Sequence, residues 1–122
     1  MKPGFRYFVA CICLLNLFFG AAGCGGGFAC TANVAPGLNV SIFDSRSGAA
    51  LPATTTLTEG TYQETSSQDQ TIFAGAFERA GTYTVRVTKA GYASYEKTGF
   101  AVTKGDCHVN TVNIRVDLQP LQ

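Results

Sequence analysis

A strict alternation of apolar and polar side chains over residues 81–88 most constrains how this chain can fold. In this stretch, GTYTVRVT, the apolar residues Tyr83, Val85 and Val87 alternate with threonines and one arginine. Successive side chains of a β-strand point to opposite faces, so a period of two is typical of a strand with one buried face. The Lys-Ala-Gly segment that follows predicts a turn, and the chain then returns along a path that ends at 99–102. The sequence therefore predicts an antiparallel pair in the middle of a small β domain.

Five more short strands are predicted around this pair, each bounded by turn-forming residues. They are a strand of about seven residues from Leu38, then 53–57, 61–65, 72–77 and 112–118. In the strand at 72–77, either the isoleucine and alanines or the two phenylalanines can form the buried face. Val109 is out of phase with the last strand, which predicts a bulge or a strand start near 110–111. About seven short strands with no helical period predict an all-β fold, a two-sheet antiparallel β-sandwich.

The first 23 residues are predicted to be a cleaved signal peptide and not part of this domain. Lys2 and Arg6 give a positive start, and residues 8–19 are a nearly unbroken apolar run of 12 residues. Only small residues follow, at 20–23, which completes the order of a secretory signal. A membrane-spanning helix needs about 20 apolar residues, so this run is too short to remain as a transmembrane anchor.

The end of the signal peptide decides where the protein is expected to be found. Its last residues, Ala21-Ala22-Gly23-Cys24, resemble the bacterial lipobox, in which small residues lead into a cysteine that is lipidated and becomes the new N-terminus. Ala21 departs from the pattern, which usually has Leu there. Gly25 after the cysteine resembles lipoproteins sent to the outer membrane. The resemblance implies a lipid on Cys24 and a place in the bacterial cell envelope, on the periplasmic or surface face of the outer membrane. The alternative is ordinary cleavage after Ala22 or Gly23, which leaves Cys24 as a free thiol.

The number of cysteines agrees with lipidation. Of the five, Cys11 and Cys13 leave with the signal peptide, and the lipid would occupy Cys24. Cys30 and Cys107 then remain as an even pair in an oxidising compartment, which predicts one disulfide between them. The alternative is two unpaired thiols.

Residues 24–35 are predicted to be a lipidated, glycine-rich tether. Three consecutive glycines at 25–27 make it flexible. Cys24 and Cys30 are six residues apart, a distance that even a fully extended chain limits to about 20 Å. If a disulfide fixes Cys30 to the body of the domain, the domain has to sit against the membrane surface.

The central strand and its turn also resemble a known family. Residues 81–87, GTYTVRV, followed by KAGY at 89–92, are similar to the carboxypeptidase regulatory-like domain, a prealbumin-like (transthyretin-like) sandwich. The opening strand and turn at 37–51 look like the start of that family. The similarity covers roughly 36–118 and implies a prealbumin-like β-sandwich for residues 36–122.

The charge and the single histidine exclude several function classes. Without Lys2 and Arg6, seven Lys and Arg residues remain against eight Asp and Glu, a net charge of −1 with no basic stripe. Nucleic-acid binding is therefore not expected. His108, beside Cys107, is the only histidine, and with Asp106 it could supply two metal ligands at most in this stretch. Because a metal site usually needs three or four ligands, we expect no metal, no cofactor and a polar turn at this place.

No catalytic residue is predicted either, because no nucleophile-elbow or similar signature is present. Prealbumin-like relatives include hydroxyisourate hydrolases, which use several histidines and a C-terminal Tyr-Arg-Gly-Ser tail. They also include intradiol dioxygenases, which bind iron through two tyrosines and two histidines. One histidine and the ending Gln-Pro-Leu-Gln meet neither requirement.

The sequence thus predicts a lipid-anchored, non-enzymatic envelope domain with a structural or protein-interaction role. Its expected partners are the membrane, through the lipid, and an envelope protein or polysaccharide. The alternative is a peptide- or carbohydrate-binding module whose aromatic residues line one sheet face, although most such residues would be expected in the core. The candidates are Tyr62, Phe73, Phe77, Tyr83, Tyr92, Tyr95 and Phe100. A third class, a secreted eukaryotic domain, would carry a glycan at the Asn39 sequon.

Overall fold

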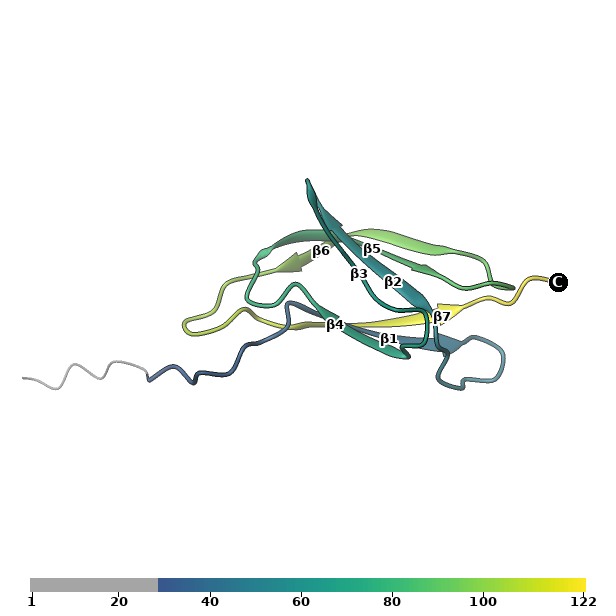
Figure 1. Cartoon of the computed structure of the whole chain (residues 1–122), viewed down its shortest axis with the longest axis horizontal. Coiled ribbons are helices and arrows are strands. Elements are labelled where there is room, and N and C mark those ends of the chain that lie inside the picture. The colour runs from purple at the N-terminus through teal and green to yellow at the C-terminus, as the bar shows by residue number, and fades with distance from the viewer. Residues whose placement is uncertain (1–28) are drawn as a thin grey trace, which may run out of the picture.

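The computed structural model describes residues 29–122, which form two β-sheets and contain no helix (Figure 1). The seven strands are β1 (Leu38–Asp44), β2 (Thr54–Glu59), β3 (Tyr62–Thr65), β4 (Ile72–Gly75), β5 (Gly81–Thr88), β6 (Tyr95–Val102) and β7 (Val112–Leu118). The prediction of an all-β fold with about seven strands is confirmed. The predicted signal peptide, the lipidation site Cys24 and the glycines at 25–27 lie outside the described residues.

The two sheets pack against each other as a β-sandwich. One sheet has the strand order β4-β1-β7 and the other the order β3-β2-β5-β6 (Figure 1). The central strand expected from the alternation at 81–88 is β5, which lies between β2 and β6. Tyr83, Val85 and Val87 are fully buried, as the period of two predicts. The same alternation buries Leu38, Val40 and Ile42 of β1 and Ile114, Val116 and Leu118 of β7.

The expectation of a wholly antiparallel sandwich is wrong at one pair. β1 and β7 run parallel, in register from Leu38 opposite Val112 to Asp44 opposite Leu118. The remaining pairs of these seven strands are antiparallel. A parallel pair cannot be closed by a tight hairpin and needs a long crossover, which here is everything between the first strand and the last. Alternating side chains bury one face whichever way the neighbouring strand runs, so the pattern could not reveal this pairing.

The structure also decides the points that the sequence left open. Phe73 is buried and Ile72 is 62% exposed, so the phenylalanine of β4 faces the core. β4 ends at Gly75, and Phe77 lies beyond it with 48% of its surface exposed. The irregularity expected near residues 110–111 is a strand start, because β7 begins at Val112. The return strand β6 begins only at Tyr95.

The domain has two distinct ends. Residues 29–37, called the lead segment here, run to one end of the sandwich, and the C-terminus lies at the opposite end (Figure 1). The end reached by the lead segment, called the lead end, also holds the loops 76–80 and 103–111. The other, the far end, holds the turns 45–50 and 89–94. There the backbone N–H of Leu121 donates to the carbonyl of Gly91, which ties the C-terminus to this end.

Gly37, where the lead segment enters β1, is expected to tolerate a side chain poorly. A Cβ there would lie 2.7 Å from the carbonyl oxygen of Ala76, a backbone atom that cannot move aside. Gly37→Ala is therefore expected to cost about 3 kcal/mol of unfolding free energy, at the upper end of the usual overpacking cost. Gly48→Ala is the control, because a Cβ at Gly48 meets nothing within 4 Å and only its positive φ of 72° opposes it. That backbone strain costs about 1 kcal/mol. Equal losses in urea-unfolding curves of the two variants would contradict this account.

Candidate functional site

A disulfide joins the lead segment to the body of the domain at the lead end. Cys30 is bonded to Cys107, 77 residues later, with their Cα atoms 5.2 Å apart. Cys107 lies in the loop between β6 and β7, so the bond fixes the chain just before it enters the sandwich. The predicted pairing of Cys30 with Cys107 is confirmed.

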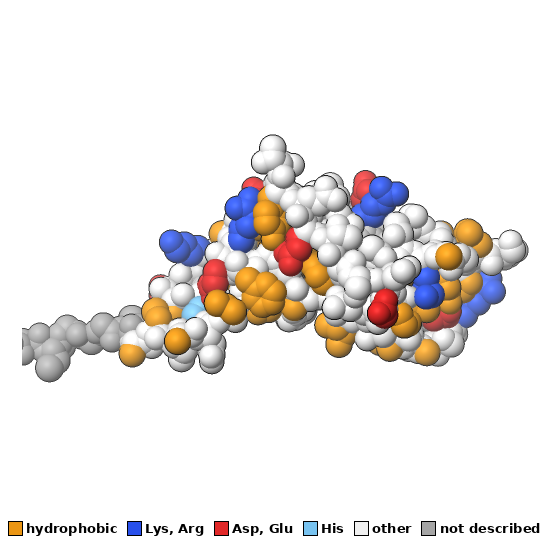
Figure 2. All heavy atoms as spheres, viewed as in Figure 1, with side chains coloured by type: hydrophobic (Ala, Val, Ile, Leu, Met, Phe, Trp, Pro, Cys, Tyr) orange, Lys and Arg blue, Asp and Glu red, His pale blue; other side chains and the backbone are white. Residues whose placement is uncertain are grey.

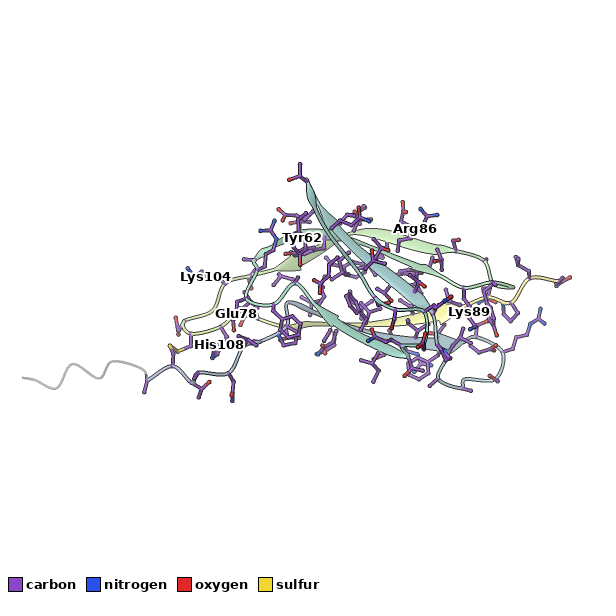
Figure 3. All side chains as sticks on the ribbon, in the orientation of Figure 1. Tyr62, Glu78, Arg86, Lys89, Lys104 and His108 are labelled. Atoms are coloured by element: carbon purple, nitrogen blue, oxygen red, sulfur yellow. A yellow bond between two sulfur atoms is a disulfide. The ribbon has the colours of Figure 1, made fainter. Side chains whose placement is uncertain are left out.

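Three side chains beside the disulfide make a second connection, which we call the lead clasp: Thr31, Glu78 and His108. The Nδ1 atom of His108 lies 2.6 Å from Oε1 of Glu78, and its Nε2 atom lies 3.1 Å from Oγ1 of Thr31. Figure 3 shows Glu78 and His108 close together at this end of the molecule. The Glu78 carboxylate also accepts hydrogen bonds from the backbone N–H groups of Ala35, at 2.7 Å, and Val109, at 3.3 Å. The clasp therefore connects the lead segment to both loops of the lead end.

The clasp holds Glu78 in an unusual backbone conformation. Glu78 has a φ of 50°, and Ala76 nearby has a φ of 53°. For residues other than glycine this region costs about 1–2 kcal/mol each. The hydrogen bond from Ala35, followed by the contact with His108, lowers the pKa of Glu78 and so favours its charged form. Hydrogen bonds to a charged carboxylate are stronger than neutral ones and offset part of this strain.

Thr31, His108 and Glu78 contact one another in the sequence in which a catalytic triad places its nucleophile, its base and the acid that orients the base. Acyl transfer additionally requires donors placed 2.7–3.1 Å from a developing oxyanion. The backbone N–H groups of Ala35 and Val109, which lie next to this cluster, are already directed at the Glu78 carboxylate. Thr31 is exposed, so the cluster does not enclose it in a desolvated site. The contacts described here fasten chain segments together, and the expectation of no catalytic residue stays a prediction.

The lead end also contains a shallow pocket of about 320 Å³. Lys104, Cys107 and His108 line it from the β6–β7 loop, with Glu78 and Arg79 on the other side. Asp106, considered above with His108 as a metal ligand, lies in the same loop. Residues 29–122 contain no group of three or more side chains that could hold a metal ion. They also contain no helix long and apolar enough to cross a membrane.

At the far end, Asp44 organises the turn that follows β1. Its carboxylate accepts a hydrogen bond of 2.7 Å from the Tyr92 hydroxyl and two more from the backbone N–H groups of Arg46 and Ser47. These bonds, that of Tyr92 first, lower the pKa of Asp44 from 3.8 to about 2. The turn at 45–50 is therefore held to the turn that contains Tyr92 by an ionised group.

Asp44→Asn is expected to flatten the dependence of the melting temperature on pH in acid. A carboxylate whose pKa is lowered by folding stabilises the protein above its unfolded pKa, and this contribution is lost as the pH falls through its folded pKa. For Asp44 that range runs from 3.8 down to about 2. The wild type should lose more stability than the variant there, as measured by thermal melts at several pH values. Asp69→Asn, in an exposed loop, should follow the wild type, and parallel curves for wild type and Asp44→Asn would contradict the prediction.

The aromatic residues considered as a binding face are mostly in or against the core. Tyr83 and Phe73 are buried, and Tyr62, Tyr92, Tyr95 and Phe100 are partly buried against the core. Phe77 alone of the seven is among the exposed large hydrophobic residues. Tyr62 donates a 2.6 Å hydrogen bond to Glu64, and burial followed by this bond raises the pKa of Tyr62 to about 12. These rings therefore serve mainly to pack the fold.

A different surface, on the outer face of the β4-β1-β7 sheet, has the chemistry of a ligand site. Phe43 lies there beneath the guanidinium of Arg115, whose Cζ is 3.8 Å from the ring centre and which also pairs with Asp117. Across the same strands the side-chain amide of Asn39 donates to that of Asn113 at 3.2 Å. Phe43 and Arg115 line a surface pocket of about 310 Å³. Sequence reasoning missed this face because it depends on the pairing of β1 with β7.

Comparison of the chain with protein-family models and with curated proteins found no match.

Proposed function

We propose that the protein is a lipid-anchored, non-enzymatic β-sandwich of the bacterial cell envelope that acts as a structural or protein-interaction module. The observation that carries this proposal is the attachment of Cys30 to the body of the domain by its bond to Cys107. Cys24, where the lipobox resemblance places the lipid, is six residues before Cys30. Chain geometry limits that separation to about 20 Å, so the lead end would be held close to the membrane surface.

The lead clasp supports the same arrangement. Thr31 bonds to His108, and Ala35 bonds to Glu78. The lead segment is therefore held at two further points after the disulfide. A tether that only needed to be long and flexible would not need such contacts. The far end, with the Asp44 turn and the C-terminus, would then be directed toward partners in the envelope.

The domain organisation follows from this proposal. Residues 1–23 would be a signal peptide, residues 24–35 a lipidated tether and residues 36–122 a carboxypeptidase regulatory-like domain of prealbumin-like fold. Seven strands in sheets of three and four support a sandwich of this general kind. The glycine at position 25 supports the outer membrane as the destination.

A second candidate function is favoured by the outer face of the β4-β1-β7 sheet. Its amides, its guanidinium and the Phe43 ring are groups that bind peptides or carbohydrates. A binder should lose affinity when Arg115 is replaced by Ala, whereas a purely structural module should behave like the wild type. Titration of the purified domain with envelope polysaccharide fragments and peptides, followed by NMR, distinguishes the two.

The proposed anchoring is tested by extracting isolated cell envelopes in sequence. High salt removes proteins held by charge, and alkaline carbonate removes those held by other protein contacts. The protein should resist both and be released by detergent. Release by salt or carbonate, or recovery in the soluble fraction, would reject a lipid anchor.

A further inference from the structure

Four large hydrophobic side chains are exposed in the part of the chain that the structure describes. They are Val34, Ile72, Phe77 and Leu121, between 48% and 66% exposed. Val34, in the lead segment, and Phe77, in the 76–80 loop, both lie at the lead end, whereas Ile72 lies at the opposite end of β4. Figure 2 shows hydrophobic side chains on the surface next to the grey trace and also toward the opposite end. Exposed apolar side chains that lie together, as Val34 and Phe77 do, indicate a contact surface more than single scattered ones do.

Val34 and Phe77 are brought together by backbone contacts, although 43 residues separate them in the chain. The N–H of Glu78 donates to the carbonyl of Ala35 at 2.9 Å, and the N–H of Ala35 donates to the Glu78 carboxylate at 2.7 Å. Val34 directly precedes Ala35, and Phe77 directly precedes Glu78. The lead clasp therefore holds Val34 and Phe77 at the same end of the domain.

The position of these residues relative to the tether indicates what covers them. Val34 is four residues after Cys30, which is bonded to Cys107, and ten residues after Cys24. A lipid on Cys24 would therefore bring a bilayer to this end of the molecule and not to the far end. The charged residues of this end balance, with Glu78 and Asp106 against Arg79 and Lys104, so no strong electrostatic attraction to the bilayer is expected. A contact of this end with the bilayer would therefore be mainly apolar.

We propose that Val34 and Phe77 form a membrane-contact surface, inserting into the interfacial region of the bilayer and setting the orientation of the domain. This inference rests on the proposed lipid anchor. Removing an exposed aromatic ring and a valine from water is favourable at the boundary between headgroups and acyl chains. The acyl chains on Cys24 would supply most of the attachment, and this second contact would fix how the domain is oriented on the bilayer. Ile72 lies at the start of β4, away from the lead end, and would reach the bilayer only if the domain lay on its side.

The absence of tryptophan from the sequence allows a direct test. Phe77→Trp and Leu121→Trp are made in the full lipidated protein, each giving one fluorescent probe on an exposed hydrophobic position. Each variant is reconstituted into phosphatidylethanolamine–phosphatidylglycerol vesicles with or without brominated acyl chains, which quench nearby indole rings. Leu121 is the control, because it is also an exposed hydrophobic residue, 62% exposed against 48% for Phe77, but is bonded to the turn of Gly91 at the far end.

The Phe77→Trp emission should shift to shorter wavelength in vesicles, and brominated lipid should quench most of its intensity. The Leu121→Trp emission should change little in either respect. Equal quenching of both variants, or of neither, would overturn the proposal. A blue shift that depends on protein concentration and not on brominated lipid would overturn it in favour of a second copy of the chain. Flotation of the vesicles distinguishes failure of the lipid anchor from failure of the membrane-contact surface. If the protein floats but Phe77→Trp is not quenched, the anchor stands and this surface does not, and if the protein fails to float, both fail.

Discussion

Replacing Cys24 with Ser is expected to move the protein from the membrane fraction to the soluble fraction. Each CH₂ group of an acyl chain contributes about 0.8 kcal/mol when it enters the bilayer, so a whole chain dominates the membrane affinity. Val34 and Phe77 alone would not hold the domain there. Fractionation followed by quantitative immunoblotting measures the change.

The matched control for this variant is the double replacement of Cys30 and Cys107 with Ser. It removes the disulfide of the described domain but leaves the proposed lipidation site intact, so the protein should remain in the membrane fraction. If the Cys24→Ser protein also stays with the membrane, the lipid anchor is wrong. If only the double variant is lost from the membrane, the disulfide and not the lipid controls localisation.

Loss of the disulfide is expected to give the largest change in stability. A bond between residues 77 apart restricts the unfolded chain, which in the chain-entropy treatment is worth about 4 kcal/mol. The total free energy of unfolding of natural domains is about 5–15 kcal/mol, so the disulfide contributes a large share of the stability. For a domain of this size the melting temperature should fall by about 15–30 °C.

Thermal melts with and without a reductant check this expectation. The double replacement of Cys30 and Cys107 should melt low in both conditions, and Cys24→Ser should melt like the wild type in both. An unchanged melting curve after reduction would show that the lead clasp and the core suffice. Together the two sets of variants separate attachment, which depends on Cys24, from folding stability, which depends on the Cys30–Cys107 bond.

Much of the fold could be predicted from local patterns. β5 and β7 alternate apolar and polar residues strictly, so their buried faces follow from the sequence. β4 is short and apolar on both faces, and the pattern could not choose between Ile72 and Phe73. The parallel pairing of β1 with β7 joins the first strand of the sequence to the last. Local sequence contains no information on such a long-range pairing.

The candidate site was predictable only in its covalent part. Counting cysteines identified the Cys30–Cys107 pair, and the position of His108 beside Cys107 predicted a polar turn. The role of Glu78 was not predictable, because it depends on a positive φ at a residue that is not glycine and on partners 30 to 43 residues away. Val34 and Phe77 likewise become neighbours only once the Ala35–Glu78 contact is formed.

The central claim, that a lipid attaches this sandwich to the membrane by a short tether, is tested most directly by mass spectrometry of the N-terminal peptide of the mature protein. The expected peptide begins at Cys24 and carries the added mass of acyl chains. A peptide that begins at Gly23, or at an unmodified Cys24, would contradict the claim.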